Sequence, residues 1–172
     1  MIPTSRPGVT LRLATRDDVP LILDFIRALA EYEREPDSVA STASMLETEL
    51  FGERPGAEVV IAEADGQPAG FALFFHNFST WLGRRGLYLE DLFVRPEFRG
   101  RGVGLVLMTY LAKLAVERGC GRFEWSVLDW NTPAIDFYRS LGAVGLEEWT
   151  VQRLTGEALR KLAAGFDASG LS

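Results

Sequence analysis

A glycine-rich turn between a strand-like segment and an apolar helical segment constrains the fold of this chain more than any other feature. Three of the five residues 100–104 are glycine, in the stretch FRGRGVGLVL. Glycine loses more conformational entropy on folding than any other residue, so this density indicates a backbone that bends sharply or approaches another group closely. Pro96 ends the extended segment 87–94, because the residue before a proline disfavours the helical region. After the turn, apolar residues recur at helical spacing as far as Gly119.

The turn has the pattern Arg99-x-x-Gly102-x-Gly104 at the start of the predicted helix. The free N–H groups and the positive dipole end of a helix attract anions, and glycines let the backbone approach phosphate oxygens closely. The pattern lacks the spacing of the dinucleotide fingerprint and the Gly-Lys-Ser/Thr of a P-loop. On the glycines alone, a phosphate-binding turn and a flexible structural turn are equally open.

Apolar patterns elsewhere predict a single domain, residues 1–172, in which strands and helices alternate. The hairpin signal Asp65-Gly66 joins two of the strands. These elements predict a mixed α/β sheet covered by helices. The predicted strands are residues 9–13, 58–64, 67–75, 87–94, 122–128 and 149–154, and residues 76–86 are a predicted loop. The predicted helices are residues 18–32, 43–51, 103–118, 132–141 and 157–164.

Composition narrows the class of protein. One cysteine among 172 residues excludes an internal disulfide and a cysteine-built metal site, and one histidine argues against a histidine-built zinc site. The 24 acidic and 18 basic residues argue against a general nucleic-acid binder, because phosphate neutralisation needs a basic face. No apolar run approaches the roughly 18 residues of a membrane span, and the first ten residues lack the core of a secretory signal. We expect a cytoplasmic protein that binds a small molecule, without nucleic acid, membrane or metal.

The stretches EDLFVRPEFRGRGVGLVLM and WNTPAIDFYRSLGA together resemble the GNAT superfamily of N-acetyltransferases. The closer resemblance, over residues 11–162, is to the diamine (spermidine/spermine) acetyltransferases and their thialysine-acetylating relatives. LAEYE, LYLEDLFV, RGRGVG and WNTPAIDFY are its specific parts. The resemblance implies one N-acetyltransferase domain with a mixed, mostly antiparallel central sheet. That sheet is splayed at the acetyl-CoA strand, which carries a bulge, and helices cover both of its faces.

The resemblance also implies which residues bind acetyl-CoA, with no metal. The pantetheine arm lies along the backbone of the strand, and the glycine turn holds the pyrophosphate. A second loop and helix contact the cofactor further along the chain. The implied strand residues are Leu92, Phe93 and Val94. The implied turn residues are Arg99, Gly100, Arg101, Gly102, Val103, Gly104 and Leu105, and the later ones are Asn131, Thr132, Pro133 and Ala134.

Two residues match the family's catalytic groups, Tyr138 as the proton donor and Glu90 as the carboxylate at the acceptor amine. A primary amine with a pKa of about 10.4 is neutral in only about one molecule in a few thousand at pH 7. Glu90 could attract the ammonium and accept its proton, and Tyr138 could protonate the leaving thiolate. Direct attack needs no covalent enzyme intermediate. The residues that match the acceptor site are Tyr32, Glu33, Glu90, Asp91, Glu124, Trp125 and Ser126.

Alternatives stay open for these assignments. Tyr138 is also compatible with a half-buried core tyrosine, and Glu90 beside Asp91 with a solvated pair at a strand edge. The acceptor is a polyamine or diamine-like cation, or instead thialysine, another amino acid, an aminoglycoside or a protein amine. The other class of protein that stays open is a module that binds acetyl-CoA without catalysis. The resemblance and the apolar segment WTVQRL further imply a homodimer.

Overall fold

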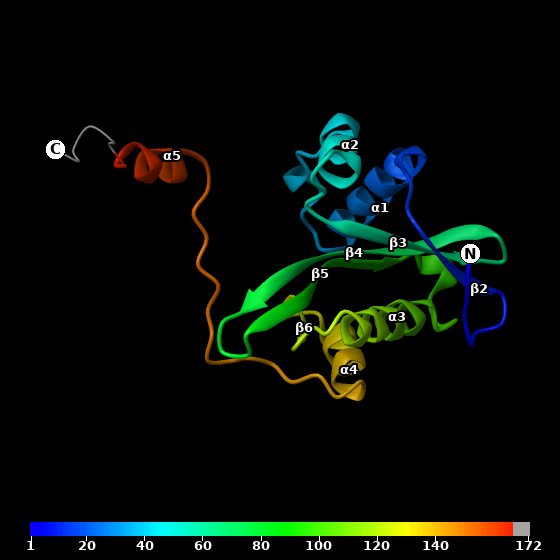
Figure 1. Ribbon diagram of the computed structural model, residues 1–172. Coiled ribbons are helices and arrows are strands. Elements are labelled where there is room, and N and C mark those ends of the chain that lie inside the picture. Colours follow the sequence, from blue (N-terminus) through cyan, green and yellow to red (C-terminus); the bar gives the residue numbers. More distant parts are fainter. Residues whose placement is uncertain (167–172) are drawn as a thin grey trace. The chain divides into compact units, whose positions relative to one another are not determined.

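The computed structural model describes residues 1–166, and the chain divides into two compact units, Met1–Leu128 and Asp129–Ser172. The first unit contains a six-stranded sheet in which the strands follow their order in the chain (Figure 1). Neighbouring strands are antiparallel except for the last two, which are parallel. The strands are β1 Ile2–Pro3, β2 Val9–Leu13, β3 Glu58–Ala64, β4 Gln67–Ser79, β5 Arg84–Val94 and β6 Phe123–Trp125.

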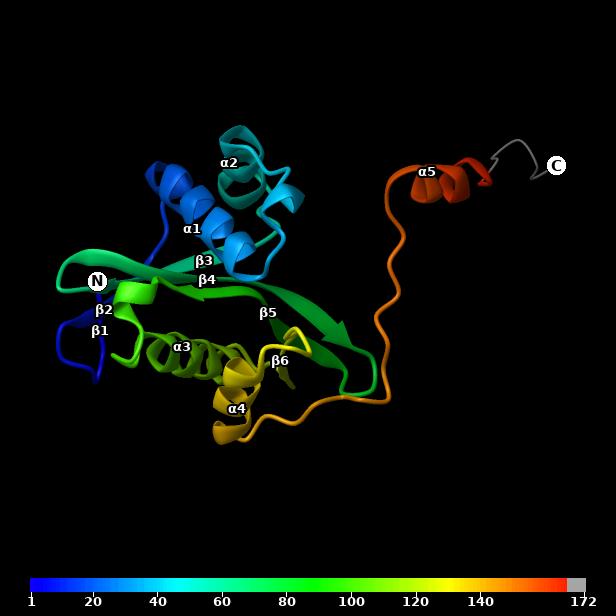
Figure 2. The same cartoon turned by 180° about the vertical axis from the view of Figure 1, so that it is seen from behind.

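Helices cover both faces of this sheet, as predicted. In Figures 1 and 2, α1 (Val19–Tyr32) and α2 (Ala43–Phe51) lie on one face and α3 (Val103–Glu117) lies on the other. Phe25 of α1 stacks on Phe71 of β4 with ring centroids 5.2 Å apart, inside the apolar core between helix and sheet. The predicted fold class is therefore confirmed: a mixed, mostly antiparallel sheet with helices on both faces.

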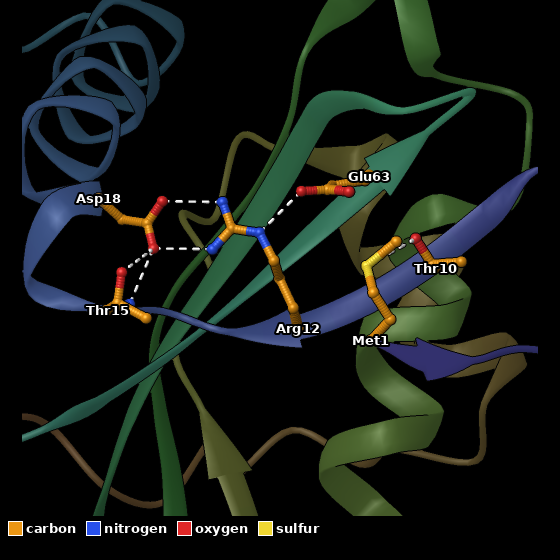
Figure 3. Close-up of polar contacts among 6 residues, drawn as sticks. All are labelled: Met1, Thr10, Arg12, Thr15, Asp18 and Glu63. Atoms are coloured by element: carbon orange, nitrogen blue, oxygen red, sulfur yellow. Dashed lines mark hydrogen bonds and ion pairs between the residues drawn. The ribbon is translucent and has the colours of Figure 1, made fainter.

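Arg12 of β2 fixes the entry of the chain into α1 (Figure 3). Its guanidinium donates two hydrogen bonds to Asp18, at 2.7 and 2.8 Å, and one to Glu63 of β3 at 2.7 Å. The Asp18 carboxylate also accepts a hydrogen bond from the N–H of Thr15 at 2.8 Å. The hydrogen bond from Arg12 is the main reason that the pKa of Asp18 is lowered to about 2.

Three strands, β4, β5 and β6, differ in length from the prediction. The predicted loop 76–86 is wrong at both ends, because β4 and β5 continue pairing in register as far as Ser79 opposite Arg84. Backbone pairing needs no apolar side chains, so the polar residues of this hairpin arm concealed it. The predicted strand 122–128 forms only as β6, since its pairing with β5 ends at Trp125. The two-residue β1 was too short to show any periodicity.

The second unit contains two described helices, α4 (Thr132–Ser140) and α5 (Gly156–Ala164), at the predicted places. The predicted strand 149–154 is wrong, because this segment forms no strand and its side chains are exposed. A strand needs a neighbour for its backbone hydrogen bonds, and no neighbour pairs with this segment within residues 1–166. None of the helices described up to residue 166 combines the length and apolar composition needed to cross a membrane.

Candidate active site

Glu90 is the extra residue of a β-bulge in β5. Across the β4–β5 ladder, Asp91 lies opposite Leu73, whereas the next pair is Leu89 opposite Phe74. Glu90 therefore has no residue opposite it, and its side chain is exposed. Bulges are common next to active sites, where they redirect a side chain. The structure thus contains the bulge that the family resemblance implied for this strand.

The bulge changes the face of the sheet to which the following side chains point. Before it, Leu89 pairs with Phe74, whose ring lies under the arginine that caps the end of α3. After it, the ring of Phe93 lies 6.3 Å from Phe25 of α1, on the opposite face. Because side chains alternate along a strand, Asp91 shares the face of Phe93. Without the bulge, Asp91 would point toward α3.

Three carboxylates interact on the α1 side of the bulge. Burial raises the pKa of Asp91 to about 6, and the negative charges of Glu90 and Glu33 add to the effect. Glu33 immediately follows α1, and burial raises its pKa as well. None of the three forms an ion pair among the described residues 1–166, so together they favour binding of a positive group. This cluster, Glu33, Glu90 and Asp91, can therefore attract an ammonium ion and accept a proton.

The strand β5 has an open side beyond the bulge. Its pairing with β6 runs from Leu87 opposite Phe123 to Leu89 opposite Trp125, and ends just before Glu90. The carbonyl of Val94 accepts a hydrogen bond from Arg99 Nε at 3.0 Å, so it faces away from β4. The N–H and C=O groups of successive strand residues point to opposite sides of the strand. Those of Leu92 therefore face the same open side as the Val94 carbonyl, and those of Phe93 face β4. An extended ligand can pair with the backbone there.

The glycine turn forms a shallow cradle at the start of α3. Gly100 and Gly102 have φ values of 75° and 80°, a region that other L-residues rarely adopt. A Cβ on Gly104 would meet a single side-chain carbon, at 3.9 Å. Among the hydrogen bonds described for residues 1–166, none is donated by the N–H of Gly100, Arg101 or Gly102. Backbone amides that donate to no other group of the protein suit an anion.

Two arginines of the turn have contacts within the first unit. The guanidinium of Arg99 lies 5.0 Å from the ring centroid of Tyr32 and 5.8 Å from that of Phe93. Arg101 forms an ion pair with Asp65 in the β3–β4 turn, with an N–O distance of 2.7 Å. Arg99 thus links the turn to the end of α1, where Tyr32 and the carboxylate cluster lie. Val103 and Leu105 belong to the first turn of α3.

The predicted acceptor residues at β6 lie beside the part of β5 that directly precedes the bulge. The Glu124 carboxylate accepts a hydrogen bond from Asn77 Nδ2 at 3.3 Å. The hydroxyl groups of Ser126 and Tyr88 are 2.8 Å apart and hydrogen-bonded. Trp125 is half-buried at the last paired position of β6. These contacts fix the side chains on one stretch of the sheet, and their role toward an acceptor stays a prediction.

The remaining predicted residues belong to the second unit. The Asn131 side chain accepts a hydrogen bond from Ala134 N at 3.4 Å and so caps α4, whose first turn contains Thr132 and Pro133. Tyr138 is half-buried on the same helix, and its ring lies 5.4 Å from that of the preceding phenylalanine. The roles of these residues toward acetyl-CoA and in catalysis stay predictions.

Sequence reasoning missed one charged side chain at the cradle, that of Arg6. Its Nε lies 2.8 Å from the position that a Cβ on Gly102 would occupy. Arg6 precedes Gly102 by almost a hundred residues and belongs to a loop between two short strands. Only the folded sheet brings the two together, and no local pattern in the sequence signals the contact.

A bulged strand with one open side, followed by a glycine turn at the start of a helix, can hold an extended ligand that carries an anionic group. The chain belongs to the acetyltransferase (GNAT) family, whose model matches residues 23–143. It is 42% identical over 167 residues to thialysine N-epsilon-acetyltransferase of Sus scrofa, across 91% of this chain and 98% of that protein. It is 34% identical to L-ornithine N5-acetyltransferase of Arabidopsis thaliana, across 88% of this chain and 86% of that protein.

A solved structure has the same fold. An integron cassette protein from the mobile metagenome of V. cholerae superposes with a TM-score of 0.76 at 30% identity, across 91% of this chain and 98% of that one. The predicted family is therefore confirmed, and the chain is an acetyl-CoA-dependent N-acetyltransferase. Within residues 1–166, no three His, Cys, Asp or Glu side chains are arranged to hold a metal ion.

Proposed function

We propose that this enzyme transfers the acetyl group of acetyl-CoA to a primary amine of a small cationic acceptor by direct attack. The observation that carries the proposal is the bulge at Glu90. It brings the carboxylate cluster Glu33, Glu90 and Asp91 beside the open side of β5, the strand that leads into the glycine cradle. A negative cluster beside an acetyl-CoA strand fits an acceptor that arrives as an ammonium ion.

Acetyl-CoA binds along β5 and the start of α3 in this proposal. The backbone groups of Leu92 and the N–H of Val94 pair with the amide groups of the pantetheine arm, as a further strand would. The free amides of Gly100, Arg101 and Gly102 donate hydrogen bonds to the pyrophosphate, which the helix dipole also attracts. Asn131, Thr132, Pro133 and Ala134, at the start of α4, contact the cofactor as well.

The reaction begins with removal of a proton from the acceptor. Glu90 takes this proton, directly or through a water molecule, while Asp91 attracts the ammonium group. The neutral nitrogen attacks the thioester carbonyl, forming a C–N bond, and the C–S bond then breaks. Tyr138 gives its proton to the leaving thiolate, whose pKa of about 8–9 resembles that of cysteine. No bond to the enzyme forms, so half-buried Cys120 takes no part.

The names of the relatives favour one class of acceptor. Thialysine and ornithine are both amino acids with a primary amine at the end of the side chain, and each relative is named for acetylation of that amine. A basic amino acid of this kind is therefore the second candidate, beside a polyamine or another diamine. The two classes differ in the carboxylate that only the amino acid carries.

The test is release of free thiol from acetyl-CoA in the presence of each amine. We expect amine-dependent release with thialysine, ornithine, spermidine or putrescine, and its loss in Glu90→Gln. Glu53→Gln, a change of the same kind at an exposed residue in the first unit, serves as the control. Activity confined to an aminoglycoside or to a peptide amine would contradict the proposed acceptor class. Full activity of Glu90→Gln would remove this residue from the mechanism.

The proposed assembly is a homodimer in the cytoplasm. Several apolar side chains after α4 are largely exposed, among them Val144, Trp149 and Val151 at 83%, 74% and 79%. Such a run of apolar surface favours cover by a partner, and the family resemblance points to a second copy of this chain. Light scattering at micromolar concentration tests this proposal. A dimer that Val151→Glu dissociates is expected, and a monomeric wild-type protein would contradict it.

A further inference from the structure

The β1–β2 loop brings a cation against the start of α3. In Figures 1 and 2 this loop, residues 4–8, lies beside the N-terminal end of α3 in both views. The guanidinium group of Arg6 lies against the backbone of Gly102, with Nε at 2.8 Å and Cζ at 3.2 Å from the position of a Cβ on that residue. The guanidinium therefore occupies the space that the missing side chain of Gly102 leaves free.

Backbone contacts hold Arg6 in this place. The Thr4 hydroxyl accepts a hydrogen bond from the N–H of Arg6 at 3.2 Å and donates one to the carbonyl of Val9 at 2.6 Å. The N–H of Val9 donates to the carbonyl of Arg6 at 3.1 Å. The loop is also joined to the β3–β4 turn, where the N–H of Asp65 donates to the Gly8 carbonyl at 2.8 Å. These hydrogen bonds fix the backbone of Arg6 relative to β2 and the β3–β4 turn.

The charge of Arg6 is not offset by a carboxylate. Arg101, which the family resemblance implied as a pyrophosphate-binding residue, forms an ion pair with Asp65. Arg6 forms no ion pair with any carboxylate among the described residues 1–166. The guanidinium of Arg6 therefore lies against the backbone of Gly102, at the positive end of α3, with no carboxylate paired to it among these residues.

We propose that Arg6 is a further pyrophosphate-binding residue of the acetyl-CoA site. The inference rests on the proposed placement of acetyl-CoA at the cradle. Its guanidinium donates to phosphate oxygens from one side, while the amides of Gly100, Arg101 and Gly102 donate from another. A guanidinium matches a phosphate group with two parallel N–H donors, which gives orientation as well as charge. The β1–β2 loop thereby becomes part of the cofactor site.

The test is the affinity for CoA and for dephospho-CoA, measured by calorimetry on Arg6→Gln, Arg6→Lys and Arg54→Gln. Arg54→Gln is the matched control, because it removes the same charge from an exposed residue between α2 and β3. We expect Arg6→Gln to weaken binding of both ligands roughly tenfold or more, as for a lost hydrogen bond to a charged group. Arg6→Lys keeps the charge but not the pair of parallel N–H donors. Its affinity for both ligands should therefore lie between those of the wild type and Arg6→Gln.

Each other outcome overturns the inference. Equal affinities of Arg6→Gln and Arg54→Gln would show that Arg6 makes no contact with the ligand. If Arg6→Gln lost affinity for CoA but not for dephospho-CoA, Arg6 would contact the 3′-phosphate and not the pyrophosphate. A wild-type protein that binds neither ligand would reject the acetyl-CoA site itself. Because Arg6 is exposed in a loop, an unchanged melting temperature separates these results from a folding defect.

Discussion

Asp91 lies opposite Leu73 on the face of the sheet that α1 covers, although the alternation of β5 before the bulge would have turned it toward α3. The inserted residue, Glu90, is the cause. Its consequence is a carboxylate that is held partly out of water, next to two others, and whose pKa is raised to about 6. A group in this state makes the folded protein less stable at neutral pH, which is typical of residues in functional sites.

The first prediction is that Asp91→Asn stabilises the protein at pH 7. The folded protein holds the Asp91 proton up to about pH 6, whereas the unfolded chain releases it near pH 3.8, the ordinary pKa of an aspartate. The wild-type free energy of unfolding should therefore fall as pH rises from about 4 to 6, and stay level above. Two pKa units correspond to about 3 kcal/mol. Partial exposure reduces the expected gain from the substitution to about 1–2 kcal/mol.

Urea unfolding across this pH range measures the effect. Asp91→Asn should remove the decline between pH 4 and 6, while Asp24→Asn, at an exposed position of α1, should leave it in place. The KM for the acceptor amine should rise in Asp91→Asn, because the acceptor loses a negative partner. An Asp91→Asn variant that is less stable than wild type at pH 7 would contradict the proposed destabilisation by the Asp91 charge.

The second prediction separates catalysis from binding at Tyr138. Tyr138→Phe keeps the ring and removes only the hydroxyl, so turnover should fall roughly ten- to ten-thousand-fold, the range for a lost general acid. Acetyl-CoA affinity and the melting temperature should change little. Tyr110→Phe, at a half-buried tyrosine of α3, is the control and should keep full turnover. Unaltered turnover in Tyr138→Phe would leave only a structural role for this tyrosine.

The third prediction tests close approach at the glycine cradle. Gly104 is better suited than Gly102, because its φ is not positive and a Cβ would meet only one carbon, at 3.9 Å. Gly104→Ala should therefore fold normally and still place a methyl group in the cradle, weakening acetyl-CoA binding about tenfold. Gly56→Ala is the control, since its added Cβ would also meet nothing closer than 3.6 Å. Unchanged calorimetric affinity in Gly104→Ala argues against pyrophosphate at this turn.

The fourth prediction concerns the ion pairs of Arg12. Its partners Asp18 and Glu63 have side-chain exposures of only 12% and 15%, so Arg12→Gln should cost about 1–3 kcal/mol at pH 7. Arg16→Gln breaks the exposed pair with Glu47 and should cost less than about 1 kcal/mol. Because the pKa of Asp18 is lowered to about 2, its share of the stability is present above about pH 4. That share is lost as pH falls toward 2.

Denaturant unfolding of both variants at several pH values provides the measurement. The difference between Arg12→Gln and wild type should narrow as the solution becomes acid. Equal losses in Arg12→Gln and Arg16→Gln would show that the partly buried network contributes no more than a surface ion pair.

The sequence determined the local elements of this protein. The proline and apolar spacing of α1, the Asp65-Gly66 hairpin and the positive φ of Gly100 and Gly102 all follow from residues close together in the chain. Short-range sterics and hydrogen bonds govern these features, so patterns in the sequence are sufficient to predict them. The resemblance of the same motifs to a known family then predicted the fold class.

Only the tertiary structure decided how the site is assembled. The bulge at Glu90 changes the face of Asp91 through its register with β4, and Arg6 reaches Gly102 through the order of the strands. The segment 149–154 has a strand-like composition but no partner strand within residues 1–166, and it forms no strand. Register, approach and pairing depend on residues far apart in the chain, so local periodicity does not encode them.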